Sequence, residues 1–148
     1  MICGEGPLEA ALRERLEALG VADSATLRGY LPLDGGLQDA YRAAHAFLHV
    51  SWTEGLPQVL FEAFAARLPV VATAVGSVAA AGDGAVLLVA PGDPKAPAAR
   101  LRELAADETL RETLVAAGLG RVRAHSLEAE LQRTGRFLRG EKVAPGHV

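Results

Sequence analysis

The chain has 148 residues, of which 50% are apolar, so it is long enough for one domain with a substantial core. Its formal net charge of −3 provides no basic face for nucleic acid, and its one cysteine excludes an internal disulfide framework and fits a reducing cytoplasm. It has no apolar run of about 20 residues, no secretory signal and no histidines at metal-ligand spacing, so we expect a cytoplasmic protein without a metal site and with at most indirect membrane contact.

The first part of the chain predicts two short strands with a helix between them. Met1–Cys3 is apolar and leads into a glycine turn at residues 4–7, as the tail of a strand does. A helix is predicted from about residue 7 to residue 19, because leucines recur on one face. Residues 25–28 predict a strand and residues 29–32 its exit loop. Because a domain rarely begins at the end of a strand, we expect a further segment upstream.

The middle of the chain predicts a strand, a polar loop, a helix and a second strand in succession. After a short helix at residues 37–44, the apolar run at residues 46–50 is typical of a central strand. Residues 51–57 form the loop, and Pro57 suits the first helical position because its missing N–H costs nothing there. Apolar residues then recur at helical spacing, and residues 69–73 predict a buried strand.

Two carboxylates frame the start of this helix. Glu54 lies in the loop, and Glu62 lies five residues past Pro57, roughly 7.5 Å along the helix axis and off the centre of its apolar face. Free N–H groups at a helix start bind phosphate, Gly55 lets the backbone approach a ligand, and carboxylates accept hydrogen bonds from hydroxyls. A nucleotide sugar, with a central diphosphate and a sugar on each side, would satisfy these groups. The alternative, that both acids are merely solvated, is left open by their spacing alone.

Three further residues admit a structural interpretation. His49 ends the strand before the loop, and a core histidine is favoured over a catalytic one. Trp52 either packs against a ligand or fills the rim of the core. Cys3 is most simply a small buried apolar residue.

The rest of the chain continues the alternation of strands and helices. A loop of small residues at 74–77 precedes an apolar run at residues 85–90 that predicts another strand. Three helices follow, at residues 94–106, 107–123 and 126–139. This pattern is typical of a parallel sheet with helices on both faces. We therefore predict an α/β, Rossmann-like nucleotide-sugar-binding domain at residues 1–140, with a helical C-terminus and a tail at residues 141–148.

The sequence resembles the C-terminal half of a glycosyltransferase family 4 enzyme of the GT-B type, which has two Rossmann domains. The likeness covers about Met1 to Pro94, with the motifs in the family's order and spacing. The most specific signal for the family is the pair Glu54 and Glu62 within this context. The matching motifs are Gly4-Glu5-Gly6-Pro7, Gly29-Tyr30-Leu31-Pro32, Ser51 with Glu54-Gly55-Leu56-Pro57, Leu60-Phe61-Glu62-Ala63-Phe64-Ala65, Pro69-Val70-Val71-Ala72-Thr73 with Val75-Gly76, and Leu88-Val89 with Pro91-Gly92-Asp93.

This resemblance implies the donor-binding half of a retaining glycosyltransferase, which transfers a sugar from a nucleotide-sugar donor to an acceptor without a metal or other cofactor. It implies that Glu54 is the catalytic residue and touches the donor sugar, that Glu62 binds the ribose hydroxyls, and that Leu31 borders the base. The backbone of residues 55–57 would face the diphosphate. The donor-binding residues implied in this way are Glu54, Gly55, Leu56, Pro57, Glu62, Leu31 and Gly76.

Two departures from the family pattern bear on activity. The family's Gly-Gly-x-x-Glu element is here Gly76-Ser77-Val78-Ala79-Ala80, which lacks the acid and so one donor contact. In the family, a strand and helix that carry an Arg and a Lys for the donor phosphates, and the acceptor-binding domain, come before the part that Met1–Pro94 resembles, and the 148 residues do not include them. We therefore expect an N-terminally truncated domain, inactive in isolation, whose partner is an acceptor-binding N-terminal domain or separate chain. The alternatives are a non-catalytic nucleotide-binding module and a Rossmann-like protein without sugar chemistry.

Overall fold

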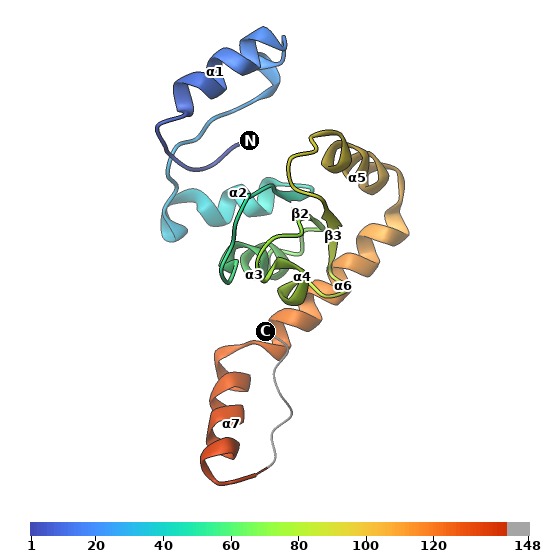
Figure 1. The fold of residues 1–148 in the computed structure, drawn as a ribbon. Coiled ribbons are helices and arrows are strands. Elements are labelled where there is room, and N and C mark those ends of the chain that lie inside the picture. Colours follow the sequence, from blue (N-terminus) through green and yellow to red (C-terminus); the bar gives the residue numbers. More distant parts are fainter. Residues whose placement is uncertain (142–148) are drawn as a thin grey trace. The chain divides into compact units, whose positions relative to one another are not determined.

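The computed structural model describes residues 1–141. The chain divides into two compact units, Met1–Arg42 and Ala43–Val148, and each is described by itself. Figure 1 labels the helices and strands used below. The prediction of one domain at residues 1–140 stays a prediction, and residues 142–148 of the expected tail lie outside the described residues.

The N-terminal unit is mostly helical. It contains α1 (Glu9–Ala18), a 3-10 turn (Ala22–Ser24), a π-helical turn (Leu33–Leu37) and α2 (Gln38–Ala43), whose last residue falls in the second unit. Gly20 follows α1 with a φ of 66°, where glycine is favoured as a cap. The leucine face of α1 is not fully covered, and none of the residues of this helix is buried.

Only one parallel bridge joins the two segments that were expected to be strands in this unit. Ile2 pairs with Leu27, and its N–H donates to the carbonyl of Thr26 over 2.7 Å. Gly4 (φ 125°) and Gly29 (φ 62°) turn the chain immediately afterwards, and the N–H of Gly4 donates to the carbonyl of Gly29. These turns end the pairing before a strand can form. Cys3, expected to be buried, is exposed.

The C-terminal unit is built on a three-stranded parallel sheet. The strands β1 (Phe47–His49), β2 (Val70–Thr73) and β3 (Val86–Val89) lie in the order β1-β2-β3, with Leu48 opposite Val71 and Val71 opposite Leu87. All four residues of β2 are buried, as its continuous apolar run predicted.

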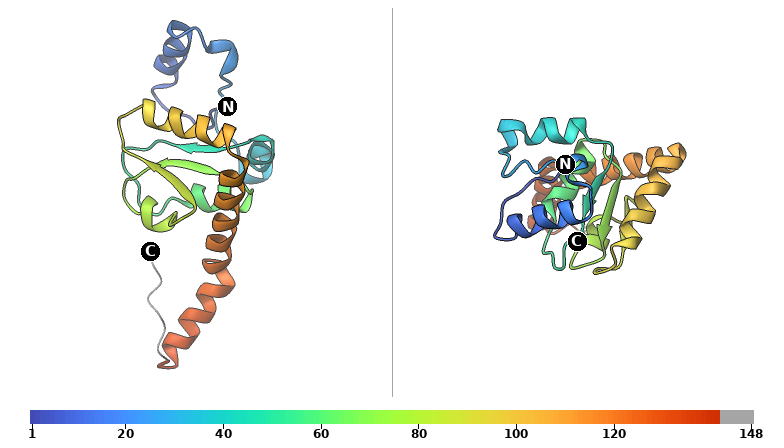
Figure 2. Two further views of the ribbon diagram at one scale, coloured as in Figure 1. Left: turned by 90° about the vertical axis from the view of Figure 1, so that its right-hand side faces the viewer. Right: turned by 90° about the horizontal axis from the view of Figure 1, so that it is seen from above.

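Helices cover both faces of this sheet, as predicted. They are α3 (Gln58–Ala65), α4 (Val78–Ala81), α5 (Lys95–Ala106) and α6 (Glu108–Ala124). α7 (Leu127–Leu138) follows α6 and has no buried residue. Figure 1 shows the strands between α5 on one side and α3 and α4 on the other, and Figure 2 shows α5 running beside the sheet. The sequence did not predict α4, which is only four residues long.

The core follows the two-residue alternation of the strands. Val71 and Val89 project to the side of α5 and pack in one cluster with Leu104 and Leu114. The neighbouring Val70 is also fully buried, as are Leu60 and Phe64 of α3, which contacts β2 and α6. The sheet is therefore fixed on both sides, which holds the carboxyl ends of its strands in place.

The last two helices begin at the residues that the sequence suggests. The Asp107 side chain accepts from the N–H of Leu110 at the start of α6, and Ser126 accepts from Ala129 at the start of α7. Arg121 of α6 donates from its guanidinium to the carbonyls of Ala80 and Ala81. Within residues 1–141, no helix has the length and apolar character needed to cross a membrane.

Candidate functional site

The central loop, residues 51–57, leaves the carboxyl end of β1 and leads into α3. The buried Thr73, which ends the neighbouring strand β2, donates from its hydroxyl to the carbonyl of Ser51 over 2.7 Å. The loop therefore starts at the edge of the sheet where open α/β folds bind ligands. This placement agrees with the prediction from the sequence.

Glu54 is held in the loop by two side chains from the same segment. One of its oxygens, Oε1, lies 2.7 Å from Nε2 of His49, and the same Nε2 lies 3.2 Å from the hydroxyl of Ser51. A hydrogen bond from Ser51 lowers the pKa of Glu54 most, burial opposes this, and the hydrogen bond and charge of His49 lower the pKa further. The side chain is 22% exposed, so a ligand can still reach it.

The loop after β2 is packed against this central loop. Gly76 (φ 52°) lies so close to the backbone carbonyl of Glu54 that a Cβ at this position would collide with it. The hydroxyl of Ser77 donates to the carbonyl of Gly55. The sequence predicted that Gly76 contacts the sugar donor. In the structure, Gly76 contacts the loop that carries Glu54.

The start of α3 has backbone donors available for a ligand. The helix begins at Gln58, so Pro57 is the residue before it and not, as predicted, its first residue. Proline has no side-chain oxygen, and among the described residues no side chain caps this end, so the N–H groups of Gln58 and Val59 point out of the helix. Gly55 and Leu56 before them are exposed, and Glu62, one turn further along, is half-buried.

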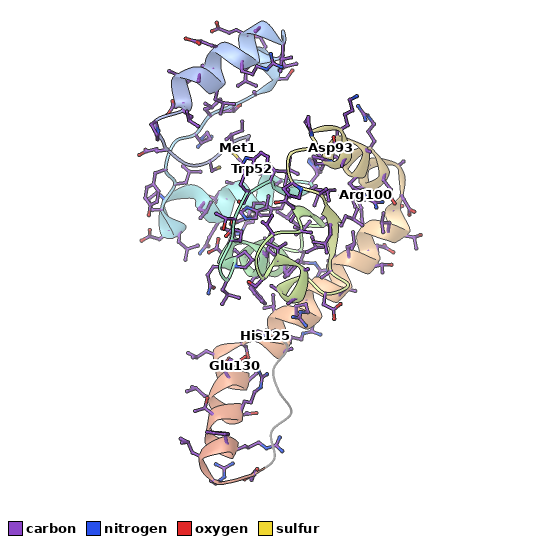
Figure 3. The ribbon with its side chains drawn as sticks, in the orientation of Figure 1. Met1, Trp52, Asp93, Arg100, His125 and Glu130 are labelled. Carbon is purple, nitrogen blue, oxygen red and sulfur yellow. The ribbon has the colours of Figure 1, made fainter. Side chains whose placement is uncertain are left out.

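A hollow of about 420 Å³ lies beside this loop, at the carboxyl ends of the three strands. Its residues are mostly apolar: they are Leu48, Val50, Ser51, Trp52, Thr73, Ala90, Gly92, Asp93, Pro94, Pro97, Ala98 and Leu101. Trp52 is 76% exposed, and its ring lies against Gly92, so it does not fill the rim of the core. Figure 3 labels Trp52 and Asp93 at this side of the unit.

Leu31 belongs to the N-terminal unit, whereas the other predicted site residues belong to the C-terminal unit. It is half-buried and follows Tyr30, whose N–H donates to a carboxylate oxygen of Glu5 over 3.1 Å. The contact of Leu31 with a base stays a prediction. The structure thus brings together Glu54, Gly55, Pro57 and Gly76, and it places Glu62 on the helix that this loop begins.

The sequence did not assign His49 or Thr73 to the site. The position of His49 at the end of a strand, five residues before Glu54, was the only available signal. No group of three or more His, Cys, Asp or Glu side chains in residues 1–141 could hold a metal ion.

Comparison with known proteins identifies the family. The family described as glycosyl transferases group 1 matches residues 1–107. The chain belongs to this family. An exopolysaccharide phosphotransferase of Streptomyces coelicolor is 35% identical to it over 113 residues, which is 74% of this chain and 12% of that protein.

Solved structures of GT-B glycosyltransferases share the Rossmann-like fold. Sucrose-phosphate synthase from Thermosynechococcus elongatus is 31% identical, with a TM-score of 0.74 over 93% of this chain and 36% of that one. Anabaena HepE, solved in complex with UDP, is 18% identical, with a TM-score of 0.82 over 93% of this chain and 40% of that one. The chain therefore spans less than half the length of these relatives.

Proposed function

We propose that this chain supplies the donor site of a retaining glycosyltransferase and binds a nucleoside diphosphate sugar. The observation that carries the proposal is the central loop, where the part-buried carboxylate Glu54 lies directly before the uncapped start of α3. Helix starts favour phosphate through their free N–H groups and the helix dipole. Family membership, together with the UDP bound to the HepE structure, supports a nucleotide as the source of that phosphate.

In the proposed complex each group has one task. Gly55, Leu56 and the N–H groups of Gln58 and Val59 take the diphosphate, and Gly76 leaves room for the loop that presents it. Glu54 accepts a hydrogen bond from a sugar hydroxyl, and Glu62 accepts from the ribose. Neutralisation of the diphosphate rests on backbone donors, so binding needs no metal ion.

Binding is tested by thermal unfolding with UDP, GDP and ADP, each with and without EDTA. A ligand at 100 times its Kd raises the free energy of unfolding by about 2.7 kcal/mol, which is a measurable shift. We expect at least one nucleotide to stabilise the chain equally in both buffers. No shift with any nucleotide would refute the donor site, and a shift that EDTA abolishes would refute metal independence.

Turnover requires the acceptor as well as the donor. Catalysis needs the two held in line, and the proposed donor site supplies one wall of the cleft between them. We therefore propose that the 148-residue chain binds the donor but transfers sugar only with an acceptor-binding N-terminal domain or partner chain. Incubation with radiolabelled nucleotide sugars and sugar or lipid acceptors tests this, and robust multiple turnover by the chain alone would contradict it.

A further inference from the structure

His49 contacts the predicted site residue Glu54, which packing in the core alone does not require. It ends β1, its side chain is 18% exposed, and its Nε2 lies between the Glu54 carboxylate at 2.7 Å and the Ser51 hydroxyl at 3.2 Å. A single ring nitrogen therefore faces two oxygens, and it has only one hydrogen to give.

The chemistry of the partners decides where that hydrogen is. An ionised carboxylate only accepts hydrogen bonds, so Nε2 has to be the donor to Glu54. A protonated Nε2 cannot accept from Ser51, which leaves the Ser51 hydroxyl able to donate to Glu54, and a hydrogen bond from Ser51 is the largest cause of the lowered pKa of that acid. Both bonds favour the ionised acid, which agrees with the lowered pKa of Glu54. Glu54 is thus held by the ring of His49 before any ligand arrives, and the Ser51 hydroxyl is a second donor within the same loop.

These two donors are themselves fixed by the sheet. The His49 ring is stacked on Phe47 of the same strand, with centroids 6.1 Å apart and planes 12° apart. The backbone carbonyl of Ser51 accepts a hydrogen bond from the hydroxyl of Thr73, which ends β2. A carboxylate on a loop is therefore held by groups attached to the sheet, which reduces the ordering cost of binding.

We propose that His49 is a positioning residue, which fixes Glu54 through Nε2–H so that its remaining acceptor sites meet a hydroxyl of the donor sugar. This inference rests on the proposed donor site. A carboxylate has about four acceptor sites, so two internal donors leave capacity for the sugar. Nucleoside diphosphate alone lacks that sugar, and its binding does not depend on His49.

The ring hydrogen can be measured without any ligand. Long-range ¹H–¹⁵N NMR of the full chain distinguishes Nε2–H from Nδ1–H, and His49→Gln identifies the signals of this ring. We expect the neutral ring of His49 to carry its hydrogen on Nε2, and its signals to move in Glu54→Gln. An Nδ1–H ring, or signals unchanged in that variant, would overturn the positioning role whatever the chain binds.

Calorimetry then tests the consequence for the sugar. The probes are UDP and three UDP-sugars carrying glucose, galactose and N-acetylglucosamine, titrated into the parent and two variants. His49→Leu keeps the bulk but donates no hydrogen bond, whereas the Nε2 amide of His49→Gln can replace the lost donor. We expect His49→Leu to bind UDP within about twofold of the parent but to lose roughly tenfold in affinity for the preferred UDP-sugar. His49→Gln should recover most of that loss.

The outcomes separate this inference from the function on which it rests. If the parent binds neither UDP nor any UDP-sugar, the proposed donor site fails, and the sugar contact fails with it. If the parent prefers one UDP-sugar and His49→Leu keeps that preference, only the positioning role is overturned. A loss that His49→Gln does not restore would indicate packing and would also overturn it. His45→Leu, a change at an exposed histidine of the same segment, controls for surface effects.

Discussion

Gly76 and Glu54 lie in contact through their backbones, at the point where the loop after β2 meets the loop after β1. A Cβ on Gly76 would collide with the carbonyl of Glu54, so the second loop can reach its position only because residue 76 has no side chain. The position of the Glu54 carboxylate therefore depends on a glycine 22 residues away in the sequence.

Replacing Gly76 with alanine should displace the Glu54 loop. We expect Gly76→Ala to weaken binding of the preferred UDP-sugar by at least tenfold, measured by calorimetry. The matched control is Gly84→Ala, which also has a positive φ (69°) but no atom within 4 Å of its added Cβ. Both variants place a side chain at a positive φ, so equal binding by the two would show that contact with Glu54 does not matter.

Among the residues that the structure describes, Arg67 is the non-glycine residue with a positive φ, at 61°, and it lies two residues after the end of α3. An L-residue in this left-handed conformation costs about 1–2 kcal/mol, of which glycine's greater chain entropy offsets about 0.5–1. We therefore expect Arg67→Gly to raise the free energy of unfolding by about 0.5–1 kcal/mol in urea titrations. Arg67→Ala, which keeps the Cβ, should not be stabilised; if it gains as much as Arg67→Gly, backbone strain is not the cause.

Gly118 allows α6 to pack closely on α3. A Cβ there would lie 2.7 Å from Cδ1 of Phe64, a fully buried ring, whereas a Cβ on Gly120 of the same helix would meet nothing within 4 Å. Both changes to alanine gain up to about 1 kcal/mol in helix propensity. Gly118→Ala also overpacks the core, at about 1–3 kcal/mol, so it should be the less stable of the two by that amount. Equal stability in urea titrations would show that the interface accommodates the methyl group.

The sequence predicts those helices and strands whose apolar residues follow a regular pattern over a short stretch of chain. The apolar runs at β2 and β3 and the helical period of α3 each lie within a single element, and the structure confirms these elements. The short helix α4 was not predicted, because a run of four small apolar residues is too short to show a helical period.

Contacts between elements could not be predicted in the same way. The bond from His49 to Glu54 depends on how the intervening loop folds, and that loop is shaped by Gly76 and Ser77, more than twenty residues later. The leucine face of α1 is a second example, because periodicity gives the apolar face but not what covers it, and no residue of this helix is fully buried. A local pattern was thus enough to predict Glu54 as a site residue, whereas the residues that hold it became visible only in three dimensions.

The lowered pKa of Glu54 predicts a pH-dependent contribution to stability. The folded value is below the unfolded one, so this contribution is complete above the ordinary value of 4.5 and is lost as the pH falls through the lowered value. Glu54→Gln cannot ionise and lacks it. We expect urea titrations to show a larger difference in unfolding free energy between parent and Glu54→Gln at pH 7 than at pH 3. A difference independent of pH would mean that Ser51 and His49 do not stabilise the ionised acid.

Glu54 and Glu62 should bind different parts of the nucleotide sugar. If Glu62 accepts from the ribose, Glu62→Gln should lower the affinity for UDP roughly tenfold or more, because charge-assisted hydrogen bonds contribute about 1.5–3 kcal/mol. Glu54→Gln should leave UDP binding intact and weaken only the UDP-sugar. Calorimetry on both variants with both ligands measures this division, and Glu112→Gln, a change at an exposed glutamate of α6, is the control.

The ribose assignment has a second, independent check in the ligand. 2′-Deoxy-UDP lacks one of the hydroxyls that Glu62 is proposed to bind, so the parent should bind it more weakly than UDP. In Glu62→Gln the charge-assisted contact is already gone, and the two ligands should bind with nearly equal affinity. If the variant binds UDP like the parent, or still distinguishes the two nucleotides as strongly, Glu62 does not bind the ribose and the interpretation of a merely solvated acid is the better one.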